Sequence, residues 1–288
     1  MKIIAVDIGG TTIKSAVFIE GKFIDSYSVK TRGNTNRNLI LEGVFNTIDR
    51  FFDKDVIYIS ISSAGNIDIE NGKCVYATDN LKGWTGLEIK KIITEKYKVS
   101  TFVENDAICS LKGELANYSS HNDVVMLTLG TGVGGAAIID NNIVHGNKFT
   151  GMRFGHMIIE SNGYVCNCGS RGCVEQYISA TALVREAKKY NSNIKNGKEI
   201  FELYRNNDQN MKKVVDNFMH YFNVTINSIN QLLDPSLIII GGGISLAKDI
   251  ILEKLDKNIK NVVFAKYGDK SALYGAYIFA TEELERKR

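Results

Sequence analysis

The chain has 288 residues, of which 44% are hydrophobic, 23% charged and 9% aromatic. This composition excludes a disordered chain and a collagen-like repeat, and the length suits one large domain or two modest ones. The 35 basic and 32 acidic residues leave a net charge of +3, which does not indicate a nucleic-acid-binding surface.

No apolar stretch is long enough for a membrane helix, and Asp7 interrupts the first apolar run too early for a secretory signal. Three of the five cysteines crowd into positions 166–173. That cluster is typical of a metal site in a reducing compartment and not of a disulfide framework. We therefore expect a cytoplasmic protein with no nucleic-acid partner and no membrane partner.

Short apolar runs separated by turn residues open the chain and predict strands at 3–6, 13–19 and from 23 onward. Thr85 and Glu88 have capping-box spacing and predict the start of a helix that runs toward Tyr97. The remaining elements predicted for this half are a helix at 38–52, strands at 56–62 and 101–103, and a helix at 106–117.

The opening pattern returns at residue 124, where an apolar run, a glycine-rich segment and a second apolar run follow one another up to residue 139. A constant shift aligns Asp7 with Thr128 and Glu20 with Asn141, which favours two related lobes. A chance match of two hairpins is the alternative.

The last third predicts a long helix at 208–233 that ends at Asp234-Pro235, and a buried strand at 237–240. Two further helices are expected at 246–255 and 271–285, and the mixture gives an α/β class. We place a small N-terminal lobe at 1–107 and a large lobe at 108–271, which contains a metal-binding loop at 156–173. The C-terminal helix, about 272–288, can pack back onto the first lobe.

Two glycine-rich segments lie between predicted strands, at 9–12 and at 130–135. The second has the glycine spacing of a dinucleotide fingerprint, but a strand follows it where that fingerprint needs a helix, and no GxxxxGK[ST] loop occurs. Backbone N–H groups in such turns form an anion-binding concavity, and the hydroxyls of Thr11, Thr12 and Thr131 add donors. We therefore favour phosphate binding over plain hairpins.

Asp7 precedes the first glycine segment and is placed to hold Mg²⁺ through water. A third cluster, formed by Gly241, Gly242 and Gly243, lies between a buried strand and a helix. It suits a flat ring or a ribose resting on backbone, and a plain strand-to-helix turn is an equally good interpretation.

The cysteines form a C-x-C-x₄-C pattern, Cys166, Cys168 and Cys173, and His156 precedes it by ten residues. Three thiolates and one imidazole make a closed tetrahedral zinc site of the structural kind. A nucleic-acid-binding zinc ribbon is the rival, but the chain lacks a second CxxC and basic flanks. Cys74 and Cys109 are expected in the core, and His121, His145 and His220 are expected at the surface.

Four motifs occur in order: DIGGTTIK at 7–14, ENDA at 104–107, LGTGVGG at 129–135 and CNCGSRGCVE at 166–175. Together they resemble the ROK family of bacterial sugar kinases and sugar-responsive repressors, from residue 1 to about 280. The resemblance implies the actin-like ATPase (ribonuclease H-like) fold with central mixed sheets, ATP in the larger lobe and sugar at the hinge. It also implies a homodimer.

The resemblance further implies that Asp106 is the catalytic base, which takes the proton of the sugar 6-hydroxyl as that oxygen attacks the γ-phosphate of ATP. From the residues alone, Asp106 is an equally good candidate for a helix N-cap, and the two roles are compatible.

The family's substrate-side loop matches residues 80–84 of this chain. The candidate sugar-binding residues are Gly65, Asn105, Asp106, Arg153, His156 and Glu175, with His156 also a metal ligand beside Cys166, Cys168 and Cys173. The candidate nucleotide-binding residues are Asp7, Gly9, Gly10, Thr11, Thr12, Lys14, Gly130, Thr131, Gly132, Gly134, Gly241, Gly242 and Gly243. The expected cofactors are ATP, Mg²⁺ and structural Zn²⁺.

The chain departs from the family pattern at Arg153, where a sugar-binding glutamate is usual. An arginine only donates hydrogen bonds, so Arg153 must contact the sugar differently, turn away, or pair with an acid such as Glu175 or Glu104. N-acetylmannosamine kinases of the family also depart here. The usual proline of a second loop is missing, since Ser62-Ser63-Ala64-Gly65 stands there.

Three functions are therefore compared. The first is an ATP-dependent 6-phosphotransferase acting on a hexose or N-acetylhexosamine. The second is a sugar-sensing repressor, which would need a helix-turn-helix before the first strand, and that strand is expected to begin at Lys2. The third is a non-catalytic sugar-binding or regulatory protein, favoured only by Arg153. The completeness of the motifs favours the kinase.

Overall fold

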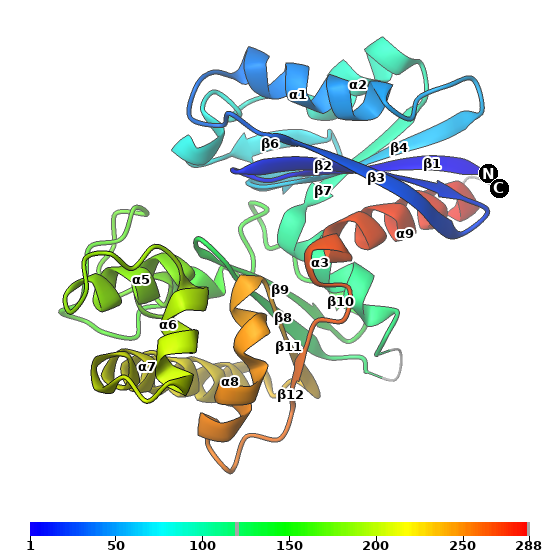
Figure 1. Ribbon diagram of the computed structural model, residues 1–288. Helices are drawn as coiled ribbons and strands as arrows, with labels where there is room; N and C mark the ends of the chain where they lie inside the picture. The colour runs from blue at the N-terminus through cyan, green and yellow to red at the C-terminus, as the bar shows by residue number, and fades with distance from the viewer. Residues whose placement is uncertain (119–120, 287–288) are drawn as a thin grey trace. The chain divides into compact units, whose positions relative to one another are not determined.

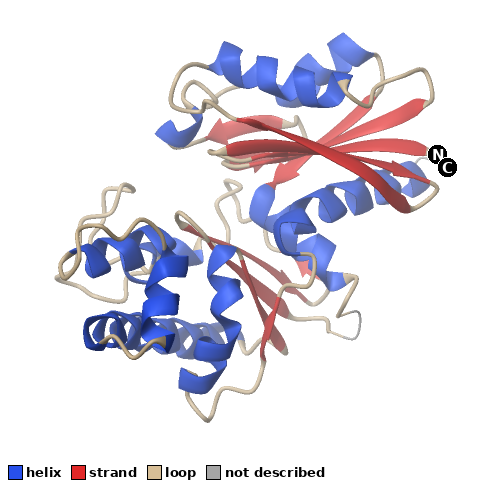
Figure 2. Cartoon of the chain, in the orientation of Figure 1, coloured by secondary structure: helices blue, strands red, loops and turns tan. Residues whose placement is uncertain are grey.

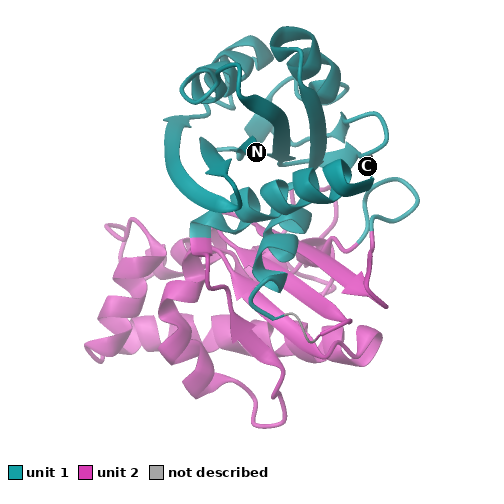
Figure 3. Cartoon of the chain, turned by 90° about the vertical axis from the view of Figure 1, so that its right-hand side faces the viewer, with its two compact units in different colours: residues 1–119, 145–151, 269–288 teal, residues 120–144, 152–268 magenta. Residues whose placement is uncertain are grey.

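The computed structural model describes residues 1–118 and 121–286. The described chain forms two compact units, each built from separate segments (Figure 3). Unit 1 comprises residues 1–119, 145–151 and 269–288, and unit 2 comprises residues 120–144 and 152–268. The expected boundary near residue 107 falls inside unit 1, because the helix that follows it belongs to that unit.

Unit 1 is organised around a five-stranded sheet in the order β3-β2-β1-β4-β7 (Figure 1). The meander β1-β2-β3 is antiparallel, whereas β4 and β7 continue the sheet in parallel beside β1. The strands are β1 (Lys2–Ile8), β2 (Thr12–Ile19), β3 (Lys22–Lys30), β4 (Val56–Ser63) and β7 (Ser100–Asn105), and β5 (Asn66–Asp68) pairs with β6 (Lys73–Tyr76) separately. The predicted strands are confirmed.

Helices cover both faces of this sheet (Figure 2). On one face, α1 and α2 bury Ile40, Val44 and Ile93 in one core cluster with side chains of β1 and β4. On the other, α3 and α9 pack so closely that a Cβ on Gly275 would lie 1.7 Å from the Cys109 carbonyl oxygen. The helices are α1 (Arg37–Asp49), α2 (Ile89–Tyr97), α3 (Asp106–Leu115) and α9 (Ser271–Arg286), with short 3₁₀ turns at Asp79–Leu81 and Gly268–Lys270.

The capping box expected at the start of α2 is wrong. The helix begins at Ile89, and Glu88 precedes it without a side-chain cap. The Thr85 hydroxyl is used elsewhere, since it accepts a hydrogen bond from the Ala77 N–H at 3.0 Å. A tertiary contact thus replaces the local one that the spacing suggests.

Unit 2 repeats the sheet topology of unit 1, in the order β10-β9-β8-β11-β12. A meander of antiparallel strands is again followed by two parallel strands beside the first one. The strands are β8 (Val124–Leu129), β9 (Val133–Ile139), β10 (Asn142–Ile143), β11 (Leu237–Gly241) and β12 (Val262–Phe264). The shared order supports the internal repeat inferred from the glycine hairpins.

The long helix α7 (Gln209–Leu233) buries Phe218, Phe222 and Ile226 in the core of unit 2 together with residues of β8 and β11. It starts after Asp208, whose side chain caps it, and ends at Asp234 in the left-handed conformation, as expected from the proline that follows. The other helices are α4 (Glu175–Ile178), α5 (Ala180–Lys188), α6 (Gly197–Arg205) and α8 (Lys248–Lys254), with 3₁₀ turns at Phe154–His156 and Gly243–Ala247.

Across the described residues, every helix is too short or too polar to span a lipid bilayer.

Candidate active site and metal centre

Two carboxylates of unit 1 lie close enough to influence each other. Asp7 lies on β1 and accepts a hydrogen bond from the Ser62 hydroxyl at 2.8 Å. Burial, with the nearby Asp106 charge as the second cause, raises the pKa of Asp7 to about 6. Burial also raises the pKa of Asp106, the first residue of α3. Two buried carboxyl groups with raised pKa values therefore lie in the same region of unit 1.

Asn105 joins two other candidate sugar-site residues. Its side-chain nitrogen donates to the Gly65 carbonyl at 2.8 Å and to Asp106 Oδ1 at 3.0 Å. Its side-chain oxygen caps α3 by accepting from the Ala107 and Ile108 N–H groups. The interpretation of Asp106 as the N-cap is therefore wrong: Asn105 caps the helix.

Glu104 is buried, with a side chain only 1% exposed, and it contacts a histidine that sequence reasoning had assigned to the surface. His145 Nε2 lies 2.8 Å from Glu104 Oε2, and Glu104 Oε1 accepts from the Asn105 N–H at 2.7 Å. The hydrogen bond to Glu104 raises the pKa of His145. No local pattern near His145 signals this pair, because the contact spans 41 positions.

The first glycine hairpin joins β1 to β2. Its Gly9 N–H donates to the Thr12 carbonyl at 3.1 Å, which closes the turn. Thr31, the residue just after β3, supports the hairpin, since its hydroxyl donates to the Gly9 carbonyl at 2.6 Å. Gly10 and Thr11 remain exposed to solvent.

Lys14 follows this hairpin on β2 and contacts Asp269, which lies in the 3₁₀ turn just before α9. Its Nζ lies 2.9 Å from both the carbonyl oxygen and a carboxylate oxygen of Asp269. Sequence reasoning missed Asp269, which lies 255 positions away.

The second hairpin joins β8 to β9 in unit 2, and it contacts the segment that follows the cysteine loop. The Val133 N–H donates to Glu175 Oε2 at 3.0 Å, and a Cβ on Gly132 would lie 2.2 Å from that same oxygen. A larger residue at position 132 would therefore have to displace the Glu175 carboxylate from this contact. Glu175, a candidate sugar ligand, also supports this hairpin, and Gly134 lies on β9 just after it.

A cavity of about 340 Å³ lies beside the third glycine cluster. Gly243 lines it from the 3₁₀ turn after β11, Phe201 and Arg205 line it from α6, and Ala180 lines it from the start of α5. Ala180 also donates its N–H to the Gly130 carbonyl at 2.8 Å. Ala180 therefore both lines the cavity and contacts the second hairpin.

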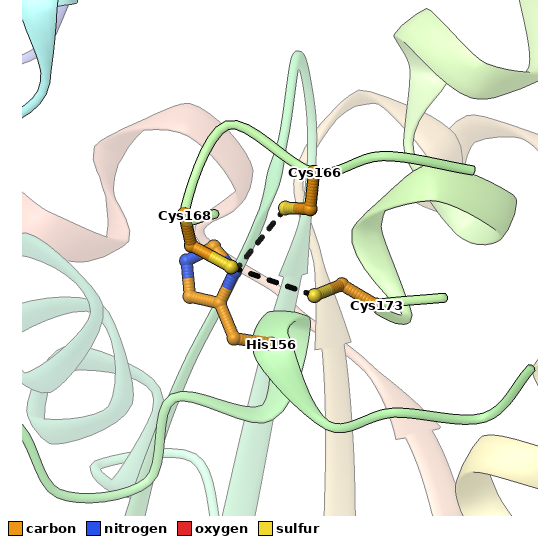
Figure 4. Close-up of side chains that lie close together, drawn as sticks. All are labelled: His156, Cys166, Cys168 and Cys173. Carbon is orange, nitrogen blue, oxygen red and sulfur yellow. Dashed lines mark hydrogen bonds between the residues drawn. The ribbon is translucent and has the colours of Figure 1, made fainter. Parts of the chain in front are cut away.

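The four candidate metal ligands of unit 2 converge (Figure 4). Cys166 Sγ lies 3.7 Å from His156 Nδ1, and Cys168 Sγ lies 3.6 Å from Cys173 Sγ. All four ligand atoms lie within 4.8 Å of one another. Tetrahedral zinc with Zn–S near 2.3 Å separates its ligands by roughly 3.5–3.8 Å, so the set fits that ion.

His156 is held in the form that ligates a metal. Burial, followed by the positive charge of Arg153, lowers the pKa of His156, which favours the neutral imidazole. Arg153 itself is exposed. Within the described residues no ion pair joins Arg153 to Glu175, and Glu104 is paired with His145, so of the three alternatives considered for Arg153 the structure does not show pairing with either acid.

The comparisons with known proteins decide the family. A model described as "ROK family" matches residues 3–283, which is nearly the whole chain. The chain belongs to the ROK family. This confirms the resemblance drawn from the four motifs.

The relatives of this ROK protein include sugar kinases. It is 30% identical over 285 residues to a glucokinase of Thermotoga maritima, covering 93% of this chain and 90% of that one. It is 27% identical over 297 residues to an N-acetylmannosamine kinase of Haemophilus influenzae, covering 99% and 97%. A ROK glucokinase of Streptomyces griseus, solved with glucose and AMPPNP, is 29% identical with a TM-score of 0.84, covering 98% and 100%.

These similarities confirm the fold class. The ROK sugar kinases that resemble this structure have the actin-like ATPase fold, and the two mixed sheets of this chain agree with it.

Because its pKa is raised in the folded protein, protonated His145 stabilises the fold. This contribution is fully present below about pH 6.5, the ordinary histidine value, and is lost as pH rises through the folded-state pKa. We expect a loss of about 1.5 kcal/mol of unfolding free energy on the alkaline side. Urea unfolding at several pH values measures it.

His145→Gln is the control, because glutamine keeps a donor but does not titrate near neutral pH. Asp7 and Asp106 also have raised pKa values, but both proteins contain them. Their contribution therefore cancels when the unfolding free energy of the variant is subtracted from that of the wild type at each pH. Parallel pH profiles for the two proteins would contradict the assignment.

Proposed function

We propose that this ROK protein transfers the γ-phosphoryl group of ATP to the 6-hydroxyl of a hexose or N-acetylhexosamine. The observation that carries the proposal is the arrangement of Asp106. Its Oδ1 accepts a hydrogen bond from the Asn105 side-chain amide at 3.0 Å, and the same amide donates to the Gly65 carbonyl. The carboxylate is thus fixed at the start of α3, beside polar groups that suit a sugar.

Asp106 acts as the general base. Its raised pKa makes it a better proton acceptor than an ordinary aspartate, because burial disfavours the ionised form. As the sugar oxygen bonds to the γ-phosphorus, the bond from that phosphorus to the β,γ-bridging oxygen breaks and ADP leaves. The hydroxyl proton passes to Asp106. Positioning and charge stabilisation supply most of the acceleration in such reactions.

The nucleotide site is proposed from the glycine clusters. The 340 Å³ cavity beside Gly243 suits adenosine, and Ala180 joins it to the Gly130 hairpin, whose N–H groups suit phosphate oxygens. Gly241 and Gly242 lead from β11 into this cavity. In unit 1 the Gly9 hairpin and Lys14 offer further donors to phosphate.

Asp7 is the proposed Mg²⁺ residue, and it would hold the ion through water. Bound magnesium neutralises charge on the β- and γ-phosphates. Zinc is the proposed occupant of the cluster of His156 and three cysteines, where it fastens the loop that precedes Glu175. We also propose the homodimer that the family resemblance implies.

A second candidate is a non-catalytic sugar-binding or regulatory protein, and one observation favours it. Arg153 replaces the usual glutamate and forms no ion pair within the described residues. A guanidinium cannot accept hydrogen bonds from sugar hydroxyls, so the sugar loses one acceptor. The change also suits a substrate other than glucose, such as N-acetylmannosamine.

A coupled ADP-release assay over a sugar panel tests the proposal, with glucose and N-acetylmannosamine first. We expect turnover on the order of 1–100 s⁻¹ with at least one sugar. The absence of turnover with every hexose, amino sugar and β-glucoside would refute it. Calorimetry with the same sugars separates the alternatives, because a non-catalytic protein binds sugar without releasing ADP.

A further inference from the structure

The two glycine hairpins share a supporting hydrogen bond from a residue that lies outside all four sequence motifs. In each one, a threonine from a later segment donates its hydroxyl to a carbonyl of the turn. Thr31 Oγ1 donates to the Gly9 carbonyl at 2.6 Å, and Thr181 Oγ1 donates to the Thr131 carbonyl at 2.7 Å.

A backbone N–H beside each threonine hydroxyl holds a second carbonyl of the same hairpin. The Thr31 N–H donates to the Thr11 carbonyl at 3.0 Å, and the Ala180 N–H donates to the Gly130 carbonyl at 2.8 Å. Each hairpin is therefore held through two of its carbonyls. The two attachments lie in different units and involve no common residue.

The geometry of the peptide bond gives these contacts a consequence. In a trans peptide the carbonyl of one residue and the N–H of the next lie in one plane and point in opposite directions. A held Gly130 carbonyl therefore orients the Thr131 N–H, and a held Thr131 carbonyl orients the Gly132 N–H. In the first hairpin, the held Gly9 carbonyl orients the Gly10 N–H.

These oriented N–H groups are the free ones. Among the residues that the structure describes, no hydrogen bond uses the N–H of Gly10, Thr131 or Gly132. Gly10 and Thr131 are exposed to solvent, and Gly132 is half-buried. Successive free N–H groups in a turn, such as those of Thr131 and Gly132, can form a binding site for anions such as phosphate.

We propose that Thr31 and Thr181 are positioning residues for the nucleotide phosphates. Each hydroxyl fixes the peptide plane of its hairpin, so that the free N–H groups are oriented before the nucleotide arrives. In this assignment each threonine acts through its hairpin and not by contact with the nucleotide. This inference rests on the proposed function, because it assigns the hairpins to phosphate.

The test compares Thr181→Val with Thr181→Ser, since valine keeps the shape and loses the donor while serine keeps the hydroxyl. We expect Thr181→Val to raise the KM for MgATP about 3- to 10-fold, the cost of one hydrogen bond, with kcat and the sugar KM nearly unchanged. Thr181→Ser should restore the KM. Thr31→Val and Thr31→Ser form the parallel pair for the first hairpin.

The control is Thr225→Val, because the buried Thr225 also donates its hydroxyl to a carbonyl, that of Tyr221 within α7. Its KM for MgATP should stay at the wild-type value. Thr31 is fully buried, so its valine variant requires a check of folding by circular dichroism. Thr181 is exposed and tests the inference even where Thr31→Val fails to fold.

A second readout does not depend on catalysis. Hydrogen exchange at the Gly130 and Val133 amides, which are bonded within the second hairpin and to Glu175, should become faster in Thr181→Val and not in Thr225→Val. Unchanged exchange together with an unchanged KM would overturn the inference alone. A wild-type chain that binds no Mg-AMPPNP in calorimetry refutes the proposed function, and the inference with it.

Discussion

Asp106→Asn is expected to lower kcat by about 10²–10⁴-fold, the contribution of a positioned general base. Asparagine keeps the shape of the side chain and the oxygen that accepts from the Ala107 N–H at 2.9 Å, so the start of α3 should stay intact. It cannot take a proton from an alcohol. Steady-state ADP release measures kcat, and calorimetry with the sugar measures binding, which should change only a few-fold.

Asp55→Asn is the matched control for charge, because Asp55 is an exposed acid of the same unit. It should leave kcat unchanged. Near-normal turnover in Asp106→Asn would remove Asp106 from the role of base. Loss of sugar binding together with turnover would instead assign Asp106 to binding alone.

Loss of the metal is expected to have the second large effect. The purified protein should contain about one zinc per chain, and Cys173→Ser should lose it, because the buried Cys173 is one of the four proposed ligands. Structural zinc contributes directly to folding, so we expect a loss of about 4 kcal/mol or more of unfolding free energy. Metal analysis and denaturant unfolding measure the two quantities.

Cys74→Ser is the control, since Cys74 is also buried but lies outside the metal cluster. This variant should retain its zinc, although the buried hydroxyl will lower its stability. A wild-type protein of native stability that contains no zinc would contradict the assignment. Because Glu175 follows the cysteine loop and binds the Val133 N–H, loss of zinc should also weaken nucleotide binding.

The tertiary structure changed the roles of several residues that local patterns had assigned. Asn105, not Asp106, caps α3, because both side chains satisfy the spacing of a cap and only the fold selects one of them. Thr85 had the spacing of a capping box but binds the backbone of Ala77. His145 looked like a surface residue and instead contacts the buried Glu104.

Local sequence patterns were enough to predict the strands and helices around the site, the two glycine hairpins and the cysteine–histidine cluster. Apolar periodicity, turn residues and ligand spacing are local properties, and they can be read over a few neighbouring residues. The family also follows from the order of short motifs. These features can therefore be predicted correctly even when the path of the chain between them is not.

The groups that support those motifs could be identified only from the way distant segments pack. Thr31 and Thr181 lie 22 and 50 positions from the carbonyls they hold, and Asp269 lies 255 positions from Lys14. A threonine hydroxyl has suitable acceptors throughout a protein, so its choice of partner depends on how distant segments pack and not on its neighbours in the chain.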